Sequence, residues 1–307
     1  MATTRQWPGR FSAVMAGGRA LVRTGGAMLG WGRLAHAPAE SEATWRAGLR
    51  GAWVKAGPYR MFARVSAHPP ANGRLPVVLV HGLVISSRYM EPLAAILGRD
   101  FRVLAPDLPG FGESDKPRHV LDVDELADAL ALWLGASGIA RAAFIGNSFG
   151  CQVLAALALR HAAVVDRLVL QGPTVDPQAR NLVVQFWRDI VNGRREPRPM
   201  GPLARIDYAK AGLGRALATA RILIRDRIEE RLPLIDAPTL VLHGSRDPVS
   251  PERWAEEAAR LLPRGRLAVV EGGTHTMNYT YPAEFAAAVL PFLQESDAAG
   301  APAEAKR

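Results

Sequence analysis

Ser148 lies between two glycines at a spacing that is typical of a nucleophilic serine. The stretch reads FIGNSFGCQV over residues 144–153, with Gly146 two positions before the serine and Gly150 two positions after it. A G-x-S-x-G run predicts that a strand ends, the chain turns sharply and a helix begins, which leaves the serine exposed at the turn. Serine also caps helices well, and this second interpretation needs no catalysis. The rest of the chain has to decide between the two.

A serine nucleophile needs a base, and His275 is the histidine whose position fits that role. A serine hydroxyl is a weak nucleophile at neutral pH until a base accepts its proton. His275 follows the run LAVVEGGT, which predicts a strand and a glycine-rich loop at the carboxyl edge of a sheet. His81 and His243 also end apolar runs. We interpret His81 as a residue that orients the next loop and His243 as a core residue. We therefore predict that His275 is the catalytic base.

The base in turn needs an acid that selects its tautomer and stabilises the imidazolium ion. Asp247 follows the run TLVLHGSR and preserves the chain order serine, aspartate, histidine. Asp176, after the run RLVLQG, is the competing candidate, and SRDP around Asp247 is also good turn chemistry. Asp107 precedes the serine and is interpreted as a turn residue. We prefer Asp247 as the acid, with Asp176 left open.

The tetrahedral intermediate of acyl transfer needs hydrogen-bond donors aimed at its oxyanion. The backbone N–H of Phe149, the residue after the serine, is one expected donor. The second should come from the loop after VVLVHG, where Leu83 is the first candidate and Val84 the alternative. Both donors belong to the main chain, so their side chains carry little information.

Composition restricts the partners and cofactors of the chain. The formal net charge of +9 over 307 residues comes from arginines scattered along the sequence, without a basic run that alternates with aromatic residues. We therefore expect no nucleic-acid partner. Cys151 is the only cysteine, so we expect no intramolecular disulfide and no metal or other cofactor, and we interpret it as a small buried hydrophobe. A reducing compartment agrees with this cysteine content, and we predict a cytoplasmic location.

Short apolar runs alternate with amphipathic patterns along most of the chain. LPVVLVHG is a continuous apolar run, as expected of a strand buried on both faces. Alternation of this kind predicts an α/β fold, with a parallel sheet and helices on both faces. Residues 174–234 interrupt it with helical patterns only, so we predict a helical lid inserted between two parts of the core, residues 49–173 and 235–293.

The two ends of the chain fall outside this alternation. Residues 1–48 are predicted to be an N-terminal extension, in which apolar residues between positions 11 and 31 recur near one helical face. A basic amphipathic helix in weak contact with a membrane surface and an extension packed on the body both stay open. Since the predicted catalytic residues all lie downstream, we expect residues 1–45 to be dispensable for catalysis. Residues 294–307 are polar and alanine-rich, which predicts a disordered tail.

The order of these motifs resembles the α/β-hydrolase family. The shared motifs, within residues 50–293, are HG at 81–82, DLPGFGES at 107–114, GNSFG at 146–150, GSRDP at 244–248 and GTH at 273–275. The resemblance implies a mostly parallel eight-stranded sheet with a lid after the sixth strand. It also implies a triad of Ser148, Asp247 and His275. Family members that attack with an aspartate at the elbow are disfavoured because position 148 is serine.

We predict a serine hydrolase that cleaves a small or medium carboxylic ester, lactone or thioester through an acyl-enzyme. The elbow is similar to that of meta-cleavage product hydrolases, so carbon–carbon bond hydrolysis of ring-fission products is the alternative. Cys151 and Thr276 depart from that pattern, whereas Arg180 and Arg188, expected on the first lid helix, are candidates for binding a substrate carboxylate. A non-catalytic binding protein of the same fold is a further alternative. The partner is a small acyl substrate, and the sequence indicates no oligomeric state.

Overall fold

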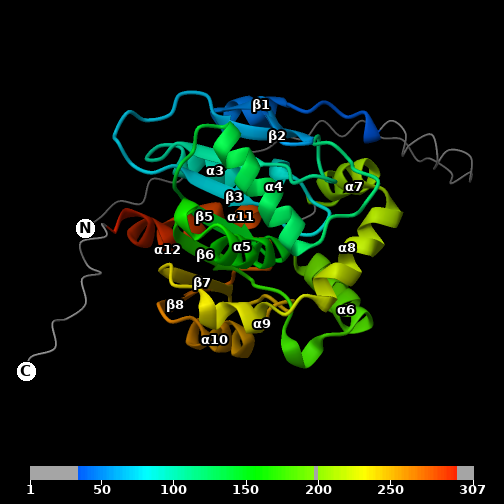
Figure 1. Ribbon diagram of the computed structural model, residues 1–307. Coiled ribbons are helices and arrows are strands. Elements are labelled where there is room, and N and C mark those ends of the chain that lie inside the picture. Colours follow the sequence, from blue (N-terminus) through cyan, green and yellow to red (C-terminus); the bar gives the residue numbers. More distant parts are fainter. Residues whose placement is uncertain (1–33, 197–199, 296–307) are drawn as a thin grey trace, which may run out of the picture.

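The computed structural model describes residues 34–196 and 200–295 and contains one eight-stranded sheet (Figure 1). Its strands lie in the order β1-β2-β4-β3-β5-β6-β7-β8. Strand β2 pairs antiparallel with β1 and β4, and the other neighbours are parallel. The strands are β1 (Leu49–Ala56), β2 (Tyr59–Ser66), β3 (Val77–Val80), β4 (Val103–Pro106), β5 (Ala142–Asn147), β6 (Val165–Gln171), β7 (Thr239–Gly244) and β8 (Gly265–Val270). The predicted mostly parallel sheet is confirmed.

Helices cover both faces of the sheet. In β3, Val78 and Val80 belong to one apolar core, whereas Val77 and Leu79 belong to the other. The first core is closed by α4 (Val123–Ala136), α5 (Phe149–Arg160) and α10 (Glu252–Leu261), and the second by α3 (Glu91–Leu97), α11 (Met277–Thr280) and α12 (Pro282–Gln294). An apolar side chain is thus needed at every position of β3, which explains the continuous apolar run in the sequence.

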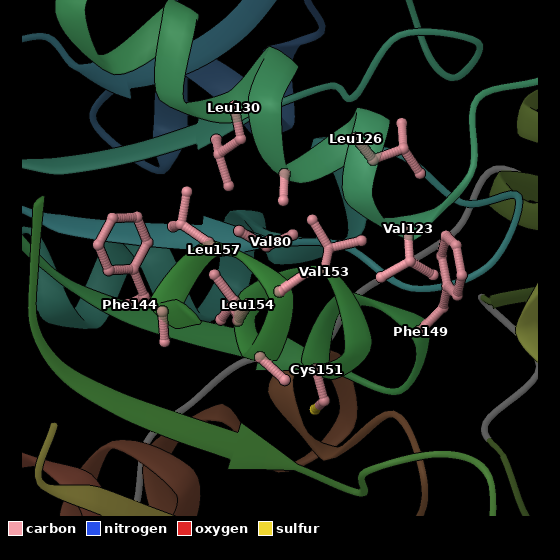
Figure 2. Packing of buried hydrophobic residues seen from close by; sticks show 14 of the residues in the cluster. Val80, Val123, Leu126, Leu130, Phe144, Phe149, Cys151, Val153, Leu154 and Leu157 are labelled. Carbon is pink, nitrogen blue, oxygen red and sulfur yellow. The ribbon is translucent and has the colours of Figure 1, made fainter. Parts of the chain in front are cut away.

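Helix α5, which begins directly after Ser148, is buried over most of its length. Figure 2 shows its side chains Leu154 and Leu157 in a cluster with Phe144 of β5 and Leu130 of α4. Packing on several sides holds the start of the helix in one position. The residue at its N-terminal end therefore has a rigid support.

A helical insertion separates β6 from β7. It contains α6 (Leu182–Arg195), α7 (Met200–Ala211), α8 (Leu213–Arg225) and α9 (Ile228–Arg231), and its described residues include no strand. Helices α6, α7 and α8 lie along one side of the molecule (Figure 1). The insertion is joined to the core by Asp207 of α7, whose carboxylate accepts hydrogen bonds at 2.9 Å from both the N–H and the hydroxyl of Ser86, in the loop after β3.

The segment before β1 is anchored by three buried basic side chains. Lys210 donates to the carbonyl of Ala37 at 2.8 Å and Arg88 to that of Pro38 at 2.8 Å, and Arg64 donates to the carbonyl of Ala39 at 2.5 Å. In the short helix α2 (Glu42–Arg46), Thr44 donates to the buried carboxylate of Glu91 at 2.6 Å. The expectation that residues 1–45 are dispensable for catalysis stays a prediction, but these contacts indicate that residues 37–44 contribute to stability.

Other expectations for the two ends lie outside the described residues. The proposed amphipathic helix between residues 11 and 31 is one of them, and so is the tail beyond residue 295. Among the helices of the described residues, none combines the length and the apolar character that crossing a bilayer requires.

Deleting residues 1–45 should lower the melting temperature by more than about 5 °C. The deletion leaves buried donors without acceptors, at a cost of about 1–3 kcal/mol for each unsatisfied group. Deleting residues 1–33 removes none of the contacts described above and serves as the control. Thermal unfolding followed by circular dichroism compares the two chains, and equal melting temperatures would contradict the anchoring role of residues 37–44.

Replacing Asp207 by asparagine should change how stability depends on pH. Burial, and then the nearby Asp107 carboxylate, raises the pKa of Asp207 to about 7, against the opposing effects of Ser86 and Arg88. Between its ordinary pKa of 3.8 and this value, the folded protein holds a proton that the unfolded chain has lost. The contribution of this carboxyl to stability therefore falls as pH rises through that interval.

The variant Asp207→Asn lacks this titration, so its melting temperature relative to the wild type should increase between about pH 4 and pH 7. Ser86→Ala removes the hydroxyl partner but keeps the carboxyl, and it should retain most of the pH dependence of the wild type. A difference between Asp207→Asn and the wild type that is constant across this pH range would argue against the buried titration.

Candidate active site

Ser148 occupies a strained turn between β5 and α5. Its backbone has φ 55° and ψ −117°, and its side chain makes no capping hydrogen bond to the helix. The N–H of Ser148 donates to the carbonyl of Gln171 at 2.9 Å, which ties the turn to the end of β6. A Cβ atom at Gly150 would lie 2.5 Å from the carbonyl oxygen of Val80, so only glycine allows this close approach. The geometry disagrees with a capping role for the serine and agrees with the predicted elbow.

The predicted oxyanion loop contains a second strained residue. Among the described residues, Val84 with φ 60° and Ser148 are the non-glycine residues with positive φ. Such strain is concentrated at functional sites in many proteins. The backbone N–H groups of Leu83 and Phe149 donate to no other group in the part of the chain that the structure describes. Neither predicted donor is thus engaged by another acceptor there, and their role toward an oxyanion stays a prediction.

His275 and Asp247 form a buried pair. The Nδ1 atom of His275 lies 2.7 Å from Oδ2 of Asp247, and the other carboxylate oxygen accepts from the N–H groups of Val249 and Ser250 at 2.8 and 3.1 Å. Burial lowers the pKa of His275, but the charge and hydrogen bond of Asp247 raise it by more, so the net pKa lies above the usual value. The carboxylate is thus held by the backbone and directs Nε2 of His275 away from itself.

Gly172 packs closely against the pair of His275 and Asp247. It follows β6 with φ 55°, and a Cβ atom there would lie 3.0 Å from both Oδ2 of Asp247 and Nδ1 of His275. Glycine is required at this position for two reasons, the positive φ and the close approach of the pair. No motif in the sequence indicates a role for Gly172.

Asp176 has other partners. Its carboxylate accepts from Arg253 at 2.6 Å and from Arg188 at 3.3 Å. Burial raises the pKa of Asp176, but the hydrogen bonds from Arg253, from the N–H of Gln178 and from Arg188, together with the charge of Arg253, outweigh it, and the pKa lies below the ordinary value. The structure pairs His275 with Asp247 and leaves Asp176 in an ion pair with arginines.

His81 and Asp107, which the sequence also offered, hold loops in place. His81 lies with Nδ1 2.9 Å from the carbonyl of Gly82, and its Nε2 accepts from the N–H of Leu108 at 3.0 Å. Asp107 accepts from the N–H groups of Ser87 and Glu113 at 2.7 and 2.8 Å. The predicted roles of His81 in orienting a loop and of Asp107 as a turn residue agree with these contacts.

A network of neutral side chains, which the sequence analysis missed, holds the loop of His275. Asn147 and Gln171, the last residues of β5 and β6, both donate to the carbonyl of His275, at 3.0 and 2.8 Å. Asn147 also donates to the side chain of Gln171 and accepts from the hydroxyl of Tyr89, which accepts from the N–H of Gly82 at 3.1 Å. The sequence feature that could have indicated this network is the amide residue at the last position of each apolar strand.

Helix α6 of the insertion contacts the same loop from the opposite side. Asn192 accepts from the N–H of His275 at 3.3 Å, and Glu196 accepts from the hydroxyl of Thr274 and the N–H of Thr276 at 3.0 and 3.1 Å. Asp189, one turn earlier than Asn192, interacts electrostatically with His275. Its carboxyl remains accessible to solvent, although surrounding protein atoms raise its pKa. The insertion thus presents negative charge to the predicted base.

The two arginines suggested for binding a carboxylate are engaged elsewhere. Arg180 precedes α6 rather than lying on it, and it donates to the carbonyls of Ile224 and Asp226 and to the carboxylate of Glu229. Arg188 is on α6 as expected but binds Asp176. In residues 34–196 and 200–295, no three His, Cys, Asp or Glu side chains are grouped so that they could hold a metal ion.

Comparisons with known proteins agree with this geometry. The chain is 29% identical over 270 residues to 2-hydroxymuconate semialdehyde hydrolase of Pseudomonas sp. (strain CF600), a match that covers 77% of this chain and 92% of that protein. It is 27% identical over 248 residues to pimeloyl-[acyl-carrier protein] methyl ester esterase of Vibrio atlanticus (strain LGP32), which covers 71% of this chain and 94% of that protein.

A solved structure has the same fold over most of the chain. A bacterial membrane phospholipase A, described as a virulence factor, superposes with a TM-score of 0.72 and 26% identity, covering 89% of this chain and 95% of that one. The sequence profile of the alpha/beta hydrolase family matches residues 77–288, which include the elbow, the insertion and the His–Asp pair. The chain therefore belongs to the alpha/beta hydrolase family, as its motifs predicted.

Proposed function

We propose that this protein is a serine hydrolase that cleaves a small or medium carboxylic ester, lactone or thioester through an acyl-enzyme. One observation supports this above all others. A strained serine without a capping bond follows β5, while the neighbouring strand ends hold a histidine whose Nδ1 lies 2.7 Å from a buried carboxylate. This combination has no evident structural purpose, because a helix start needs neither the strain nor the pair.

In the proposed reaction, Oγ of Ser148 attacks the carbonyl carbon and Nε2 of His275 accepts the hydroxyl proton. Asp247 holds the Nδ1–H of the histidine and stabilises the imidazolium ion. The N–H groups of Leu83 and Phe149 stabilise the oxyanion of the tetrahedral intermediate. The imidazolium gives its proton to the leaving alcohol or thiol, and water then releases the acid from Ser148 with His275 again as base.

Electrostatics favour an ester over the anionic products of ring fission. Asp189 and Glu196 both act on His275 with negative charge, and Arg180 and Arg188 are engaged with other groups. A substrate carboxylate would therefore meet like charges and no free arginine from this set. The names of the relatives agree with both ester and carbon–carbon bond hydrolysis, since one is a methyl ester esterase and another a 2-hydroxymuconate semialdehyde hydrolase.

The helical insertion acts as the lid of this site in the proposal. Its position is supported by Asn192 and Glu196, which contact the loop of His275, and by Asp207, which contacts the loop of the oxyanion donors. Both loops would respond to a movement of the insertion. Substrate size and shape are then set by α6 and α7 rather than by the sheet.

The experiment that tests the proposal is labelling with a fluorophosphonate, which reacts with activated serine nucleophiles. The wild type should be labelled, and Ser148→Ala should lose both the label and at least about 10⁴-fold of the ester turnover while its circular dichroism stays unchanged. Unchanged labelling of Ser148→Ala would exclude this residue as the nucleophile. A kcat/KM for p-nitrophenyl esters below that for a 2-hydroxy-6-oxo-dienoate would favour carbon–carbon hydrolysis.

The acid is tested by two matched variants in the same assay. Asp247→Asn should lower kcat by about three to four orders of magnitude, because an amide favours the wrong tautomer of His275. Asp176→Asn keeps the size of a second buried carboxyl and should retain most of the activity. The reverse order of effects would assign the role to Asp176.

Replacing Gly172 by alanine should impair catalysis without removing any polar group of the site. The new Cβ atom would displace the His–Asp pair, and we expect kcat/KM to fall at least about tenfold, equivalent to about 1.4 kcal/mol. Gly138→Ala is the control, because Gly138 also has positive φ, +70°, but nothing lies within 4 Å of its Cβ position. Equal kcat/KM for the two variants would contradict a role for the close approach of Gly172 to the His–Asp pair.

A further inference from the structure

Helix α6 has its polar side toward the protein. Asn192 is the one buried residue of this helix, and with Glu196 just beyond its end it holds the loop of His275. Gln185 donates to the carbonyl of Ala179 at 2.8 Å, and Arg188 contacts Asp176 and the carbonyl of Val249. These residues occupy one side of the helix.

The opposite side of α6 is apolar and faces solvent. Val183 and Phe186 are each 63% exposed and Trp187 is 59% exposed. Ile190 and the exposed Arg194 continue the same stripe at spacings of three and four residues. A surface helix of a globular protein normally buries its apolar stripe. The orientation of α6 is therefore reversed, and the reversal leaves an aromatic surface uncovered.

Helix α8, which contacts α6, shows a similar arrangement. Leu213 and Leu217 are 63% and 61% exposed, while Ala216, Thr219 and Leu223 are buried. The exposed side continues through Arg221 and Arg225 at spacings of four residues. In both helices the apolar residues thus come first and exposed arginines follow on the same side.

We propose that the exposed sides of α6 and α8 form a docking surface for a lipid bilayer that contains anionic lipid. Aromatic and aliphatic side chains enter the interface between head groups and acyl chains, and arginines beside them bind lipid phosphates. The charge favours this occupant, because both stripes end in exposed arginines, whereas Asp189, the acidic residue within these two helices, interacts with His275. Apolar contact alone would suit a second copy of the chain, but facing arginines would then repel each other.

The position of this surface connects it with the proposed site. The inner side of α6 contacts the loop of His275, so a bilayer bound to the outer side lies one helix diameter from the predicted base. Binding to a bilayer does not require the hydroxyl of Ser148, so a chain without the nucleophile allows binding to be measured apart from hydrolysis.

The test is sedimentation of the full-length Ser148→Ala chain with vesicles of phosphatidylcholine, alone or mixed with phosphatidylglycerol. We expect binding to the mixed vesicles and at least about tenfold weaker binding after Phe186→Ser with Trp187→Ser. Arg194→Gln with Arg221→Gln should weaken binding to the mixed vesicles only, and added salt should have the same effect. Circular dichroism verifies that each variant is folded.

The matched control carries Trp53→Ser and Leu132→Ser. These residues are 48% and 49% exposed and lie on β1 and α4, outside the insertion, so their replacement should leave vesicle binding unchanged. Equal binding by the control and the Phe186/Trp187 variant would overturn the proposal. So would binding that depends only on residues 1–33, or a dimer in solution that the Phe186/Trp187 variant converts to a monomer.

Discussion

The geometry of the predicted site depends on one atom, the carbonyl oxygen of His275. Asn147 and Gln171 both donate to it, and these two residues are direct partners in the pairing of β5 with β6. Ser148 follows the first of them and Gly172 follows the second. The loop with the histidine is glycine-rich and would have many conformations by itself. Two amides at the ends of paired strands give it the rigidity of the sheet.

Neutral side chains are better suited than charged ones to hold the loop of His275. A buried charge beside His275 would need a partner and would shift the pKa of the imidazole, whereas an amide positions the loop without net charge. Asp247 then remains the fixed charge nearest to the ring. Tyr89 extends the same network to the N–H of Gly82, next to the predicted oxyanion donor Leu83. The three loops of the proposed reaction thus share one set of hydrogen bonds.

Much of the fold could be predicted because its signals are local. The continuous apolar run of β3 requires two covered faces, and Asp122 with Glu125, three residues apart, forms a capping box at the start of α4. The elbow and the His–Asp order follow from the same logic, since parallel strands bring their carboxyl ends to one edge. Asn147 and Gln171 could not be identified in this way. Their partner is a backbone atom more than a hundred residues away, and such pairing leaves no periodic pattern.

The orientation of α6 in the insertion could not be predicted from its sequence pattern. The apolar spacing in residues 182–190 predicts a helix but not which side of it faces the protein, and burial of the apolar side is the usual assumption. Here the covered side meets the loop of His275, where hydrogen-bonding groups are needed to satisfy the N–H groups of the buried residues His275 and Thr276. Asn192 and Glu196 meet that need, and the apolar residues are thereby directed outward. The polar requirements of a site can thus determine the orientation of a helix against its hydrophobic preference, and the outer surface of the protein becomes apolar as a consequence.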